Sequence, residues 1–310
     1  MIIPLLISQK EEKIHGSFKK SIDLLQSSAQ ARGHSIGMFD SSRCKLLFDN
    51  KGTILLDGKK PKFHTLLVKP SFAGDRLDLT AMLIKQFEII GVRAVNSYSS
   101  IVHTKNKIRQ LQTLATNGIP IPRSMVVHSS VFTDDIVERL GSFPIIIKSV
   151  VGNQGVGVTM VESKRGMRAL LDMMTKTDED FGGPVIVQEY IRESSGRDIR
   201  VFVVGGKIIA AMDRVAKKQG EFRSNFSLGG KVAIAKLTTA EKRIALKTTK
   251  VTGLDFAGVD IIRSDKGPKV LEINANPGLK GITEATGIDV AGELIDYIVT
   301  LEKRALRRLM

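Results

Sequence analysis

Two apolar runs on either side of a turn signal, residues 257–274, constrain this chain most strongly. They flank the pentapeptide Ser-Asp-Lys-Gly-Pro, so they predict a β-hairpin. If the turn centres on Lys266, Asp260 and Glu272 lie directly opposite each other, because each is six residues from that centre. Glu272 and Asn274 are two residues apart and therefore share one face of their strand. We expect three oxygen-bearing side chains to gather on one patch of a sheet.

Such a patch suits a hard metal ion. Carboxylate and amide oxygens are ligands for Mg²⁺ or Mn²⁺, whereas zinc prefers His and Cys, which are absent nearby. The alternative is a solvated hairpin whose polar residues alternate outward. The Asn-Pro-Gly turn after Asn274 favours a site, because glycine backbone can approach a ligand closely.

Composition sets the broad class. The chain has 310 residues, 42% of them hydrophobic, which suits one multi-lobed enzyme or two to three small domains. A single cysteine, Cys44, rules out a disulfide within the chain and fits a reducing compartment. The first residues lack the basic start of a signal peptide, and no apolar run is long enough to span a membrane. We therefore expect a cytoplasmic protein with no membrane contact.

The formal net charge of +15 predicts anionic partners, which include nucleotides, nucleic acid and acidic polypeptides. The alternative is that the charge reflects only a basic average composition. With no Trp and three Tyr, the sequence offers few platforms for stacking single-stranded bases.

The first hundred residues predict a small open α/β domain. Strands are expected at residues 2–7, 35–39, 65–68 and 92–95, with helices at 17–32 and 77–90. No G-x-G-x-x-G follows a strand, so dinucleotide binding is not indicated. A helix at 105–117 comes next, and we expect a domain boundary just before it.

The middle of the chain carries a second signal. An apolar strand at residues 143–150 contains Lys148, a charge that is costly to bury without an anionic partner. Directly after it, Gly152, Gly155 and Gly157 form a loop whose N–H groups could cover phosphates. The loop lacks the G-K-[ST] ending of a Walker A motif, and an ordinary β-turn is the alternative.

The run VLEINANPGL at residues 270–279 resembles the metal-binding end of the ATP-grasp ligases, and most of all the RimK branch, which adds glutamate to a ribosomal protein. The resemblance covers nearly the whole chain and is densest over residues 144–287. It implies an α/β (α+β) ATP-grasp fold with an N-terminal open α/β domain at 1–103. A central lobe with a Gly-rich lid would span 104–190, and a C-terminal lobe with the metal site would span 191–310.

The resemblance also implies roles for individual residues. The metal ligands would be Asp260, Glu272 and Asn274. The catalytic arginines would be Arg200, facing phosphate or a substrate carboxylate, and Arg214, gripping a substrate carboxylate. In the nucleotide site, Lys107 and Lys148 would contact phosphate, and Asp198 would hold the ribose. Residues 188–191 would form a hinge over the adenine, and an F-R-S-N segment would reach the triphosphate. The full set of nucleotide-binding residues would be Lys107, Lys148, Gly155, Gln188, Glu189, Tyr190, Ile191, Asp198, Arg223, Ser224 and Asn225.

Each of these assignments has a plainer alternative. Lys107 could be a solvated helix lysine, in a segment where Asn106 replaces the usual Asp of the family. Asp198 and Arg200 could be a simple charge pair on one strand face. Arg214, like the F-R-S-N arginine, could be an exposed loop residue. Residues 68–74 also differ from the Pro-Arg-Ile-Gly run of RimK proteins, a region expected to help bind the acceptor.

The resemblance implies ATP-dependent ligation of L-glutamate, through an acyl phosphate, to an acidic polypeptide acceptor, a small-subunit ribosomal protein. ATP and Mg²⁺ or Mn²⁺ would be the cofactors, and a homo-oligomer, dimer or tetramer, is expected. A second possibility is a ligase of the same branch that acts on a small molecule, a cofactor or a carrier protein. A third is a non-catalytic, nucleotide-dependent ribosome- or RNA-binding protein, which need not keep three metal ligands.

Overall fold

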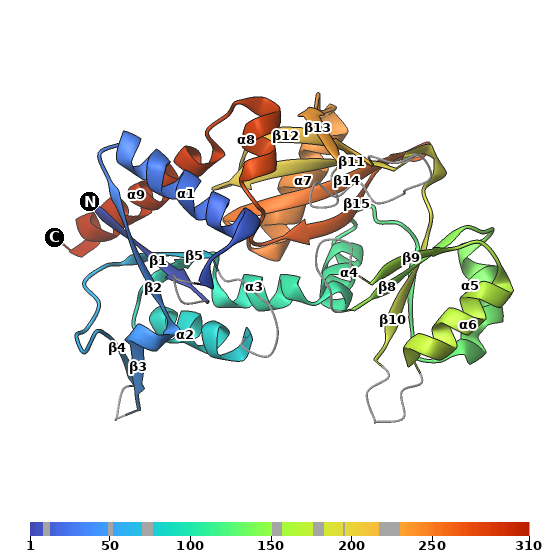
Figure 1. Ribbon diagram of the computed structural model, residues 1–310, viewed down its shortest axis with the longest axis horizontal. Coiled ribbons are helices and arrows are strands. Elements are labelled where there is room, and N and C mark those ends of the chain that lie inside the picture. The colour runs from blue at the N-terminus through green and yellow to red at the C-terminus, as the bar shows by residue number, and fades with distance from the viewer. Residues whose placement is uncertain are drawn as a thin grey trace.

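The computed structural model describes residues 1–8, 13–48, 52–69, 77–150, 157–175, 183–194, 196–216 and 230–309. Each of three lobes is built on its own sheet, and both chain ends lie at the same end of the molecule (Figure 1). Within the described ranges, no helix has the length and apolar character needed to cross a membrane.

The N-terminal lobe is the open α/β unit that the β-α-β pattern predicted, and its main sheet is parallel. Its strand order is β2-β1-β5-β6. All five residues of β5 are buried, as expected for a strand whose two faces are both covered. The strands are β1 (Ile2–Ile7), β2 (Ser35–Asp40), β5 (Thr65–Lys69) and β6 (Arg93–Val95), and the helices are α1 (Gly16–Ala31), α2 (Leu77–Ile89) and α3 (Tyr98–Lys105).

A small hairpin in this lobe was not predicted. The 3-10 turn η2 (Ser41–Arg43) leads into β3 (Cys44–Leu47), which pairs antiparallel with β4 (Thr53–Leu56). The intervening sequence Asp-Asn-Lys-Gly is a turn signal that could have revealed the hairpin.

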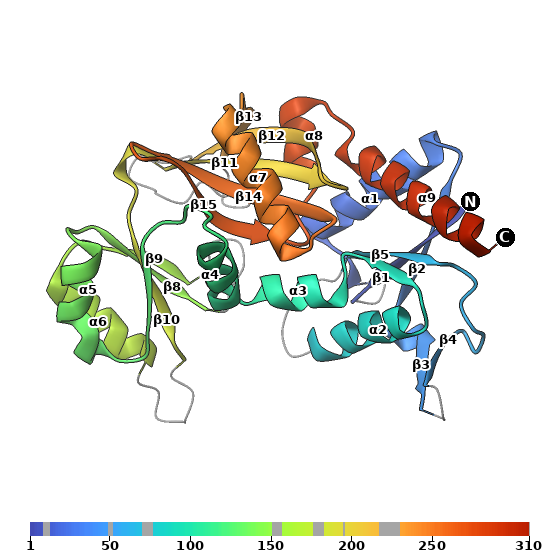
Figure 2. The ribbon, with the colours of Figure 1, turned by 180° about the vertical axis from the view of Figure 1, so that it is seen from behind.

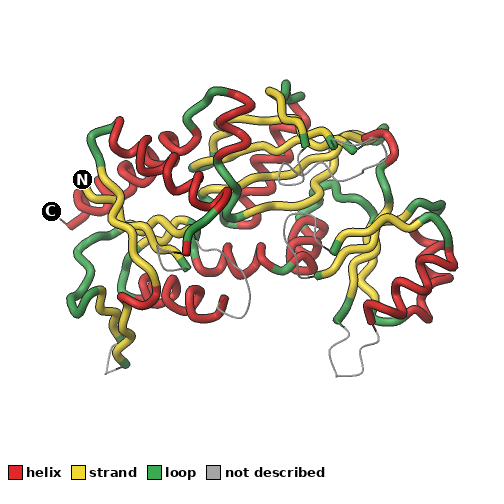
Figure 3. Tube along the Cα trace, viewed as in Figure 1, coloured by secondary structure: helices red, strands yellow, loops and turns green. Residues whose placement is uncertain are grey.

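The central lobe is an antiparallel sheet in the order β7-β10-β8-β9 with two helices on one face (Figure 3). Buried residues of α5 and α6 share one hydrophobic core with the sheet strands. The elements are β7 (Ser124–Val127), η3 (Ser130–Phe132), α5 (Thr133–Leu140), β8 (Ile145–Ser149), β9 (Val158–Val161), α6 (Lys164–Thr175) and β10 (Val185–Glu189). Of these, β7 and α5 were not predicted.

The C-terminal lobe is a five-stranded antiparallel sheet covered on both faces. Its order is β13-β12-β11-β14-β15. Alternate residues of β11 enter different cores, Val201 and Val203 with α7, Phe202 and Val204 with α9, as the twofold period of a strand requires. Figure 2 shows α7 lying along one face of this sheet. The elements are η4 (Arg192–Ser194), β11 (Arg197–Val204), β12 (Lys207–Val215), β13 (Lys231–Ile234), α7 (Thr239–Thr252), β14 (Phe256–Ser264), β15 (Gly267–Asn274), α8 (Lys280–Thr286) and α9 (Val290–Leu309).

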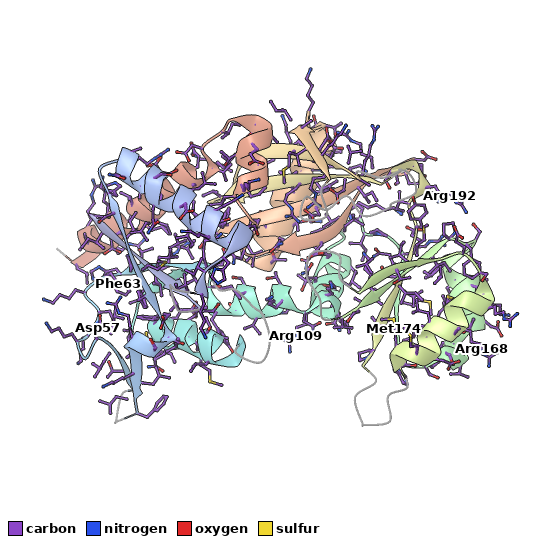
Figure 4. All side chains as sticks on the ribbon, in the orientation of Figure 1. Asp57, Phe63, Arg109, Arg168, Met174 and Arg192 are labelled. Carbon is purple, nitrogen blue, oxygen red and sulfur yellow. The ribbon has the colours of Figure 1, made fainter. Side chains whose placement is uncertain are left out.

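The helix expected at residues 105–117 is present at residues 107–116, and it follows directly on a helix that was not predicted, α3. α3 ends at Lys105, and α4 (Lys107–Thr116) begins after Asn106. The Asn106 side chain accepts hydrogen bonds from the backbone N–H groups of Ile108 and Arg109, at 2.9 and 3.1 Å. Asn and Asp are both good N-caps, so the departure from the family's Asp keeps the cap. Arg109 is exposed beside this junction (Figure 4).

The three sheets fall within the three predicted segments, although the proposed boundary at 103/104 lies inside α3. The division into domains therefore stays a prediction. α9 packs across the N-terminal lobe, where Arg32, the C-cap residue of α1, binds Asp289 at 2.6 Å and Asp296 of α9 at 2.9 Å. The last helix thus ties the first lobe to the third.

Candidate active site

The predicted hairpin exists as β14 and β15, and Asp260 lies directly opposite Glu272. The turn contains two residues, Asp265 and Lys266, so its centre lies half a residue before Lys266. An irregularity between the Asp260 and Ile261 pairs adds one residue to β15 and restores the predicted partner. Two small departures from ideal pairing therefore cancel.

Asp260 is buried, and both of its carboxylate oxygens accept hydrogen bonds from arginines. Arg200 donates to Oδ1 from Nε and to Oδ2 from an Nη atom, each at 2.6 Å, and Arg214 donates to Oδ2 at 2.8 Å. Burial alone would raise the pKa of Asp260, but the two guanidinium groups outweigh it and hold that pKa below its ordinary value. Asp260 is therefore a carboxylate held ionised inside the sheet.

Arg214 also binds Asp198, its direct neighbour across β11 and β12, at 2.6 and 2.7 Å. Burial opposes the charge on Arg214, but Asp260 and Asp198 raise its pKa above the ordinary value. We call Asp198, Arg214, Asp260 and Arg200 the charged row, because their charges alternate in sign across three strands. The exposed-loop alternative for Arg214 is wrong, since its side chain is 3% exposed.

The charged row bears on two predicted roles. Both carboxylate oxygens of Asp198 accept from Arg214, and Asp198 is buried. Asp198 keeps about two lone-pair positions and Arg214 keeps the N–H groups of Nη1 out of these bonds, so a ribose or a substrate carboxylate would have to reach them inside the sheet, where both side chains are buried. Asp198 and Arg200 share a strand face as predicted, but each pairs with a residue of another strand.

Glu272 contrasts with Asp260. It is half-buried, and within the described part of the chain it makes no hydrogen bond or ion pair. Its charge nevertheless acts on three lysines, Lys105, Lys107 and Lys148, which lie on other elements of the chain. Burial lowers the pKa of Lys105 to about 8 and that of Lys148 to about 8, and Glu272 opposes the shift in each case. For Lys107, burial likewise lowers the pKa against Glu272.

The three lysines lie at the end of α3, at the start of α4 and in β8, and the charge of Glu272 in the C-terminal lobe acts on each of them. Lys148 of β8 donates to Oε1 of Gln188 at 2.6 Å, and Lys107 of α4 donates to the carbonyl of Ser149 at 3.2 Å. Our sequence interpretation identified Lys107 and Lys148 but missed Lys105. The signal was present, because Lys105 and Lys107 flank the cap residue Asn106. The three lysine ammonium groups thus lie near the carboxylates of Asp260 and Glu272, and this grouping of positive and negative charge suits a polyphosphate with a bound cation.

The segment predicted to form the adenine hinge ends β10. Gln188 bridges Lys148 and the Ser124 hydroxyl, to which its Nε2 donates at 2.8 Å. Tyr190 is half-buried and Ile191 is buried. The backbone N–H of Glu189 donates to the carbonyl of Arg123, so it is already used within the sheet. Reading of the base by this segment stays a prediction.

The Glu189 side chain joins two lobes. It accepts from the backbone N and Nε of Arg123, at 2.9 and 2.8 Å, and from Lys269 of β15. Burial would raise the pKa of Glu189, but Lys269 and Arg123 lower it to about 2. Because β10 belongs to the central sheet and β15 to the C-terminal one, this cluster joins the two sheets.

We expect Glu189→Gln to lower the free energy of unfolding by ~2 kcal/mol at neutral pH. The folded-state pKa of Glu189 is depressed, so its stabilisation is present above the unfolded pKa and is lost as pH falls through the folded pKa of about 2. The difference between wild type and variant should therefore shrink between about pH 5 and pH 2. Urea unfolding across that range measures it, and a pH-independent difference would contradict the assignment.

The predicted metal ligands fit a hard cation in kind. Asp260, Glu272 and Asn274 offer oxygens from facing strands, and Asn274 Oδ1 already accepts from the N–H of Asn276 at 3.2 Å. Three N–H groups occupy the carboxylate of Asp260, which has about four lone-pair positions. Among the residues described, no three His, Cys, Asp or Glu side chains form a metal-binding group. A cation here would thus need amide and phosphate oxygens as well, which is the usual pattern for Mg²⁺.

Four predicted nucleotide contacts lie outside the described residues: Gly155, Arg223, Ser224 and Asn225. Their roles, and those of all the predicted site residues, stay predictions.

Comparison with known proteins supplies the family context. A family model described as the RimK-like ATP-grasp domain matches residues 104–298. A protein of Maridesulfovibrio salexigens named probable alpha-L-glutamate ligase is 37% identical over 279 residues, which are 90% of this chain and 91% of that protein. A protein of Escherichia fergusonii named ribosomal protein bS6--L-glutamate ligase is 37% identical over 276 residues, 88% of this chain and 90% of that protein.

Solved structures agree on the fold. The ATP-grasp ligase PsnB, in a complex with a minimal precursor, Mg and ADP, matches with a TM-score of 0.74 at 20% identity, over 97% of this chain and 98% of that one. D-alanine--D-alanine ligase from Bacillus anthracis matches with a TM-score of 0.67 at 18% identity, over the full length of both chains. The predicted ATP-grasp architecture is confirmed.

Proposed function

Because this chain belongs to the RimK-like ATP-grasp family and is an ATP-dependent ligase, we propose that it joins L-glutamate to the carboxyl terminus of a small-subunit ribosomal protein. The observation that carries the proposal is the 37% identity to a bS6--L-glutamate ligase over 88% of this chain, which extends beyond the 104–298 domain. The N-terminal lobe, where an acceptor is expected to bind, is therefore part of the similarity.

The proposed reaction has two steps. The acceptor carboxylate attacks the γ-phosphorus of ATP, an O–P bond forms, and ADP leaves with the electrons of the broken bond. The amine of L-glutamate then attacks the acyl carbon, loses a proton, and displaces phosphate to leave an amide. Neither step needs an enzyme nucleophile, because positioning and charge stabilisation carry phosphoryl transfer.

The electrostatic problem is to bring an anionic nucleotide against an anionic carboxylate. Lys105, Lys107 and Lys148 would bind phosphate oxygens and offset that repulsion. When bound, Mg²⁺ or Mn²⁺ held by Asp260, Glu272 and Asn274 would neutralise further phosphate charge. The half-buried position of the lysines supports the proposal, because charges in a water-poor site act more strongly than charges in bulk solvent.

The net charge of +15 supports an acidic acceptor such as a growing glutamate tail. We expect the KM for an acidic acceptor peptide to rise several-fold between about 50 and 300 mM salt, since screening weakens long-range attraction. The KM for free glutamate, a small zwitterion with one net charge, should change less. An acceptor KM that does not respond to salt would exclude a role for the overall field.

Intact-mass analysis tests the function. The protein is incubated with ATP, Mg²⁺, L-glutamate and ribosomal proteins of its own organism. A ladder of glutamate increments on one small-subunit protein, lost without ATP, would establish donor and acceptor together. ADP release with glutamate but no ladder would instead favour a small-molecule, cofactor or carrier-protein acceptor in the same branch. No ADP with any amino acid would favour the nucleotide-dependent binding protein.

We also propose that the reaction takes place in the cytoplasm, and that the enzyme is a homo-oligomer, dimer or tetramer. Light scattering on the purified protein measures its mass directly, and a monomer at working concentration would overturn the second point.

A further inference from the structure

The segment that follows the predicted metal ligands is held in an unusual way. Four buried polar side chains bond to the backbone of alternate residues in the loop at 273–279. Each side chain comes from a different part of the chain: Gln110 of α4 bonds to Ile273, Asn96 after β6 to Ala275, Lys69 of β5 to Pro277, and Ser21 of α1 to Leu279. Three of the four side chains belong to the N-terminal lobe, so that lobe grips the loop beside Asn274.

Lys69 is the one charged member of this set. Its side chain is 1% exposed, and its Nζ donates to the carbonyl of Pro277 at 3.4 Å and lies 5.6 Å from the centre of the Phe256 ring. No carboxylate of the described residues pairs with it. Burial alone lowers the pKa of Lys69 to about 7.

Such a residue costs stability. Among the described residues, the partners of the Lys69 ammonium are a carbonyl at 3.4 Å and a ring face, and such neutral partners recover little of the desolvation energy of a buried cation. A methionine would fill the same space without that cost, and replacing buried charges with apolar residues of similar volume often stabilises proteins. A group that weakens the fold in this way is expected where function requires it.

The place of Lys69 fits a functional role. It ends β5 beside the end of β1, where the chain first crosses from one side of the parallel sheet to the other. Ligands of open α/β sheets bind outside the carboxyl ends of the strands at this kind of switch point. The N-terminal lobe thus brings its conventional ligand-binding edge against the 273–279 loop.

Pro277, which accepts the hydrogen bond from Lys69, lies next to the charged row. A Cβ built on Gly258 would lie 2.9 Å from Cβ of Pro277 and 3.4 Å from Cδ of Arg200. Pro277 is therefore seated on the bare backbone of Gly258, next to the arginine that binds Asp260. If Pro277 moved, it would press on the Arg200 side chain, and it would also change the position of Asn274 at the end of β15.

We propose that Lys69 is a positioning residue that, by holding the carbonyl of Pro277, fixes the 273–279 loop against Gly258 and Arg200 and so sets the geometry of Asp260 and Asn274. The inference rests on the proposed function for its effect on turnover. Its effect on the loop is independent of any acceptor.

The test compares Lys69→Met with wild type and with Lys85→Met. Lys85 is a matched control, because its Nζ also lies over an aromatic ring, that of Tyr98 at 5.8 Å, but its side chain is 51% exposed. Three quantities are measured on each full-length protein: the midpoint of thermal unfolding, hydrogen exchange of the peptide that covers the 273–279 loop, and ADP release as a function of Mg²⁺ concentration.

We expect Lys69→Met to raise the unfolding midpoint by a few degrees, to speed exchange in the loop about tenfold, and to lower kcat about 10- to 100-fold with a higher Mg²⁺ requirement. The KM for glutamate should change little, and Lys85→Met should match wild type. A lowered midpoint with unchanged loop exchange would overturn the proposal, since Lys69 would then be only a packing residue. If wild type fails to ligate glutamate, the proposed function falls, while loop exchange and stability still decide the role of Lys69.

Discussion

Replacing Glu272 with glutamine is expected to lower the turnover of ATP-dependent ligation by ~10²- to 10³-fold, the cost typical of removing one electrostatic group from a catalytic site. The change is nearly isosteric, and within the described residues Glu272 makes no hydrogen bond that the amide would break. Stability should therefore stay within about 0.5 kcal/mol of wild type. The loss would arise because Lys105, Lys107 and Lys148 lose the carboxylate charge that acts on them. The predicted cation would also lose a ligand.

Steady-state ADP release and urea unfolding of the same preparations measure both effects. Glu284→Gln is the control, because Glu284 is an exposed glutamate that pairs with Lys280 within one helix. Extra Mg²⁺ or Mn²⁺ should partly restore the Glu272→Gln variant if the residue is a metal ligand. Full activity at ordinary metal concentration would remove Glu272 from the site.

The hairpin could be predicted because its signal is local. Apolar runs, a turn signal and a twofold period set the partners of Asp260 to within one residue, and the offset of the turn happened to be cancelled by an extra residue in β15. The cap at Asn106 is an equally local signal, although α3, the helix that ends just before it, was not predicted.

The pairing inside the charged row could not be predicted in the same way. Charges two residues apart on one strand lie about 7 Å from each other, whereas cross-strand neighbours lie about 5 Å apart, so Asp198 prefers Arg214 to Arg200. Finding this pair requires the register of β11 with β12, which no local sequence pattern provides. The sequence therefore suggested a ligand contact for Asp198, which stays a prediction, but did not reveal its pairing with Arg214.

The hydrogen bonds that hold the 273–279 loop join residues that lie even farther apart in the sequence. The bonds of Asn96, Lys69 and Ser21 span 179, 208 and 258 residues of sequence. The sequence shows a lysine at the end of an apolar strand. Its hydrogen bond to the Pro277 carbonyl becomes clear only from the packing of the N-terminal lobe on the C-terminal lobe. The N-terminal lobe, where the family resemblance was poorest, thereby contributes directly to the arrangement of the site.

Arg214→Met is expected to have the largest effect on stability, a loss of ~3–5 kcal/mol, because it leaves two buried carboxylates without their shared cation. Both Asp198 and Asp260 bond to the Arg214 guanidinium, at 2.6 to 2.8 Å, and its side chain is 3% exposed. Asp260 keeps its hydrogen bonds from Arg200, whereas Asp198 loses the arginine that donates to both of its carboxylate oxygens. Urea unfolding at neutral pH measures the change.

A double-mutant cycle separates this account from the one in which Arg214 grips a substrate. If Asp198 and Arg214 are coupled inside the sheet, adding Asp198→Asn to Arg214→Met should recover a substantial part of the lost stability, because no unpaired carboxylate then remains at that position. If Arg214 instead serves the substrate, Arg214→Met should cost less than ~1 kcal/mol and raise the KM for glutamate, with no recovery in the double variant. The first outcome would make Arg214 the residue that orients Asp260, and would leave the substrate carboxylate to be bound by another group.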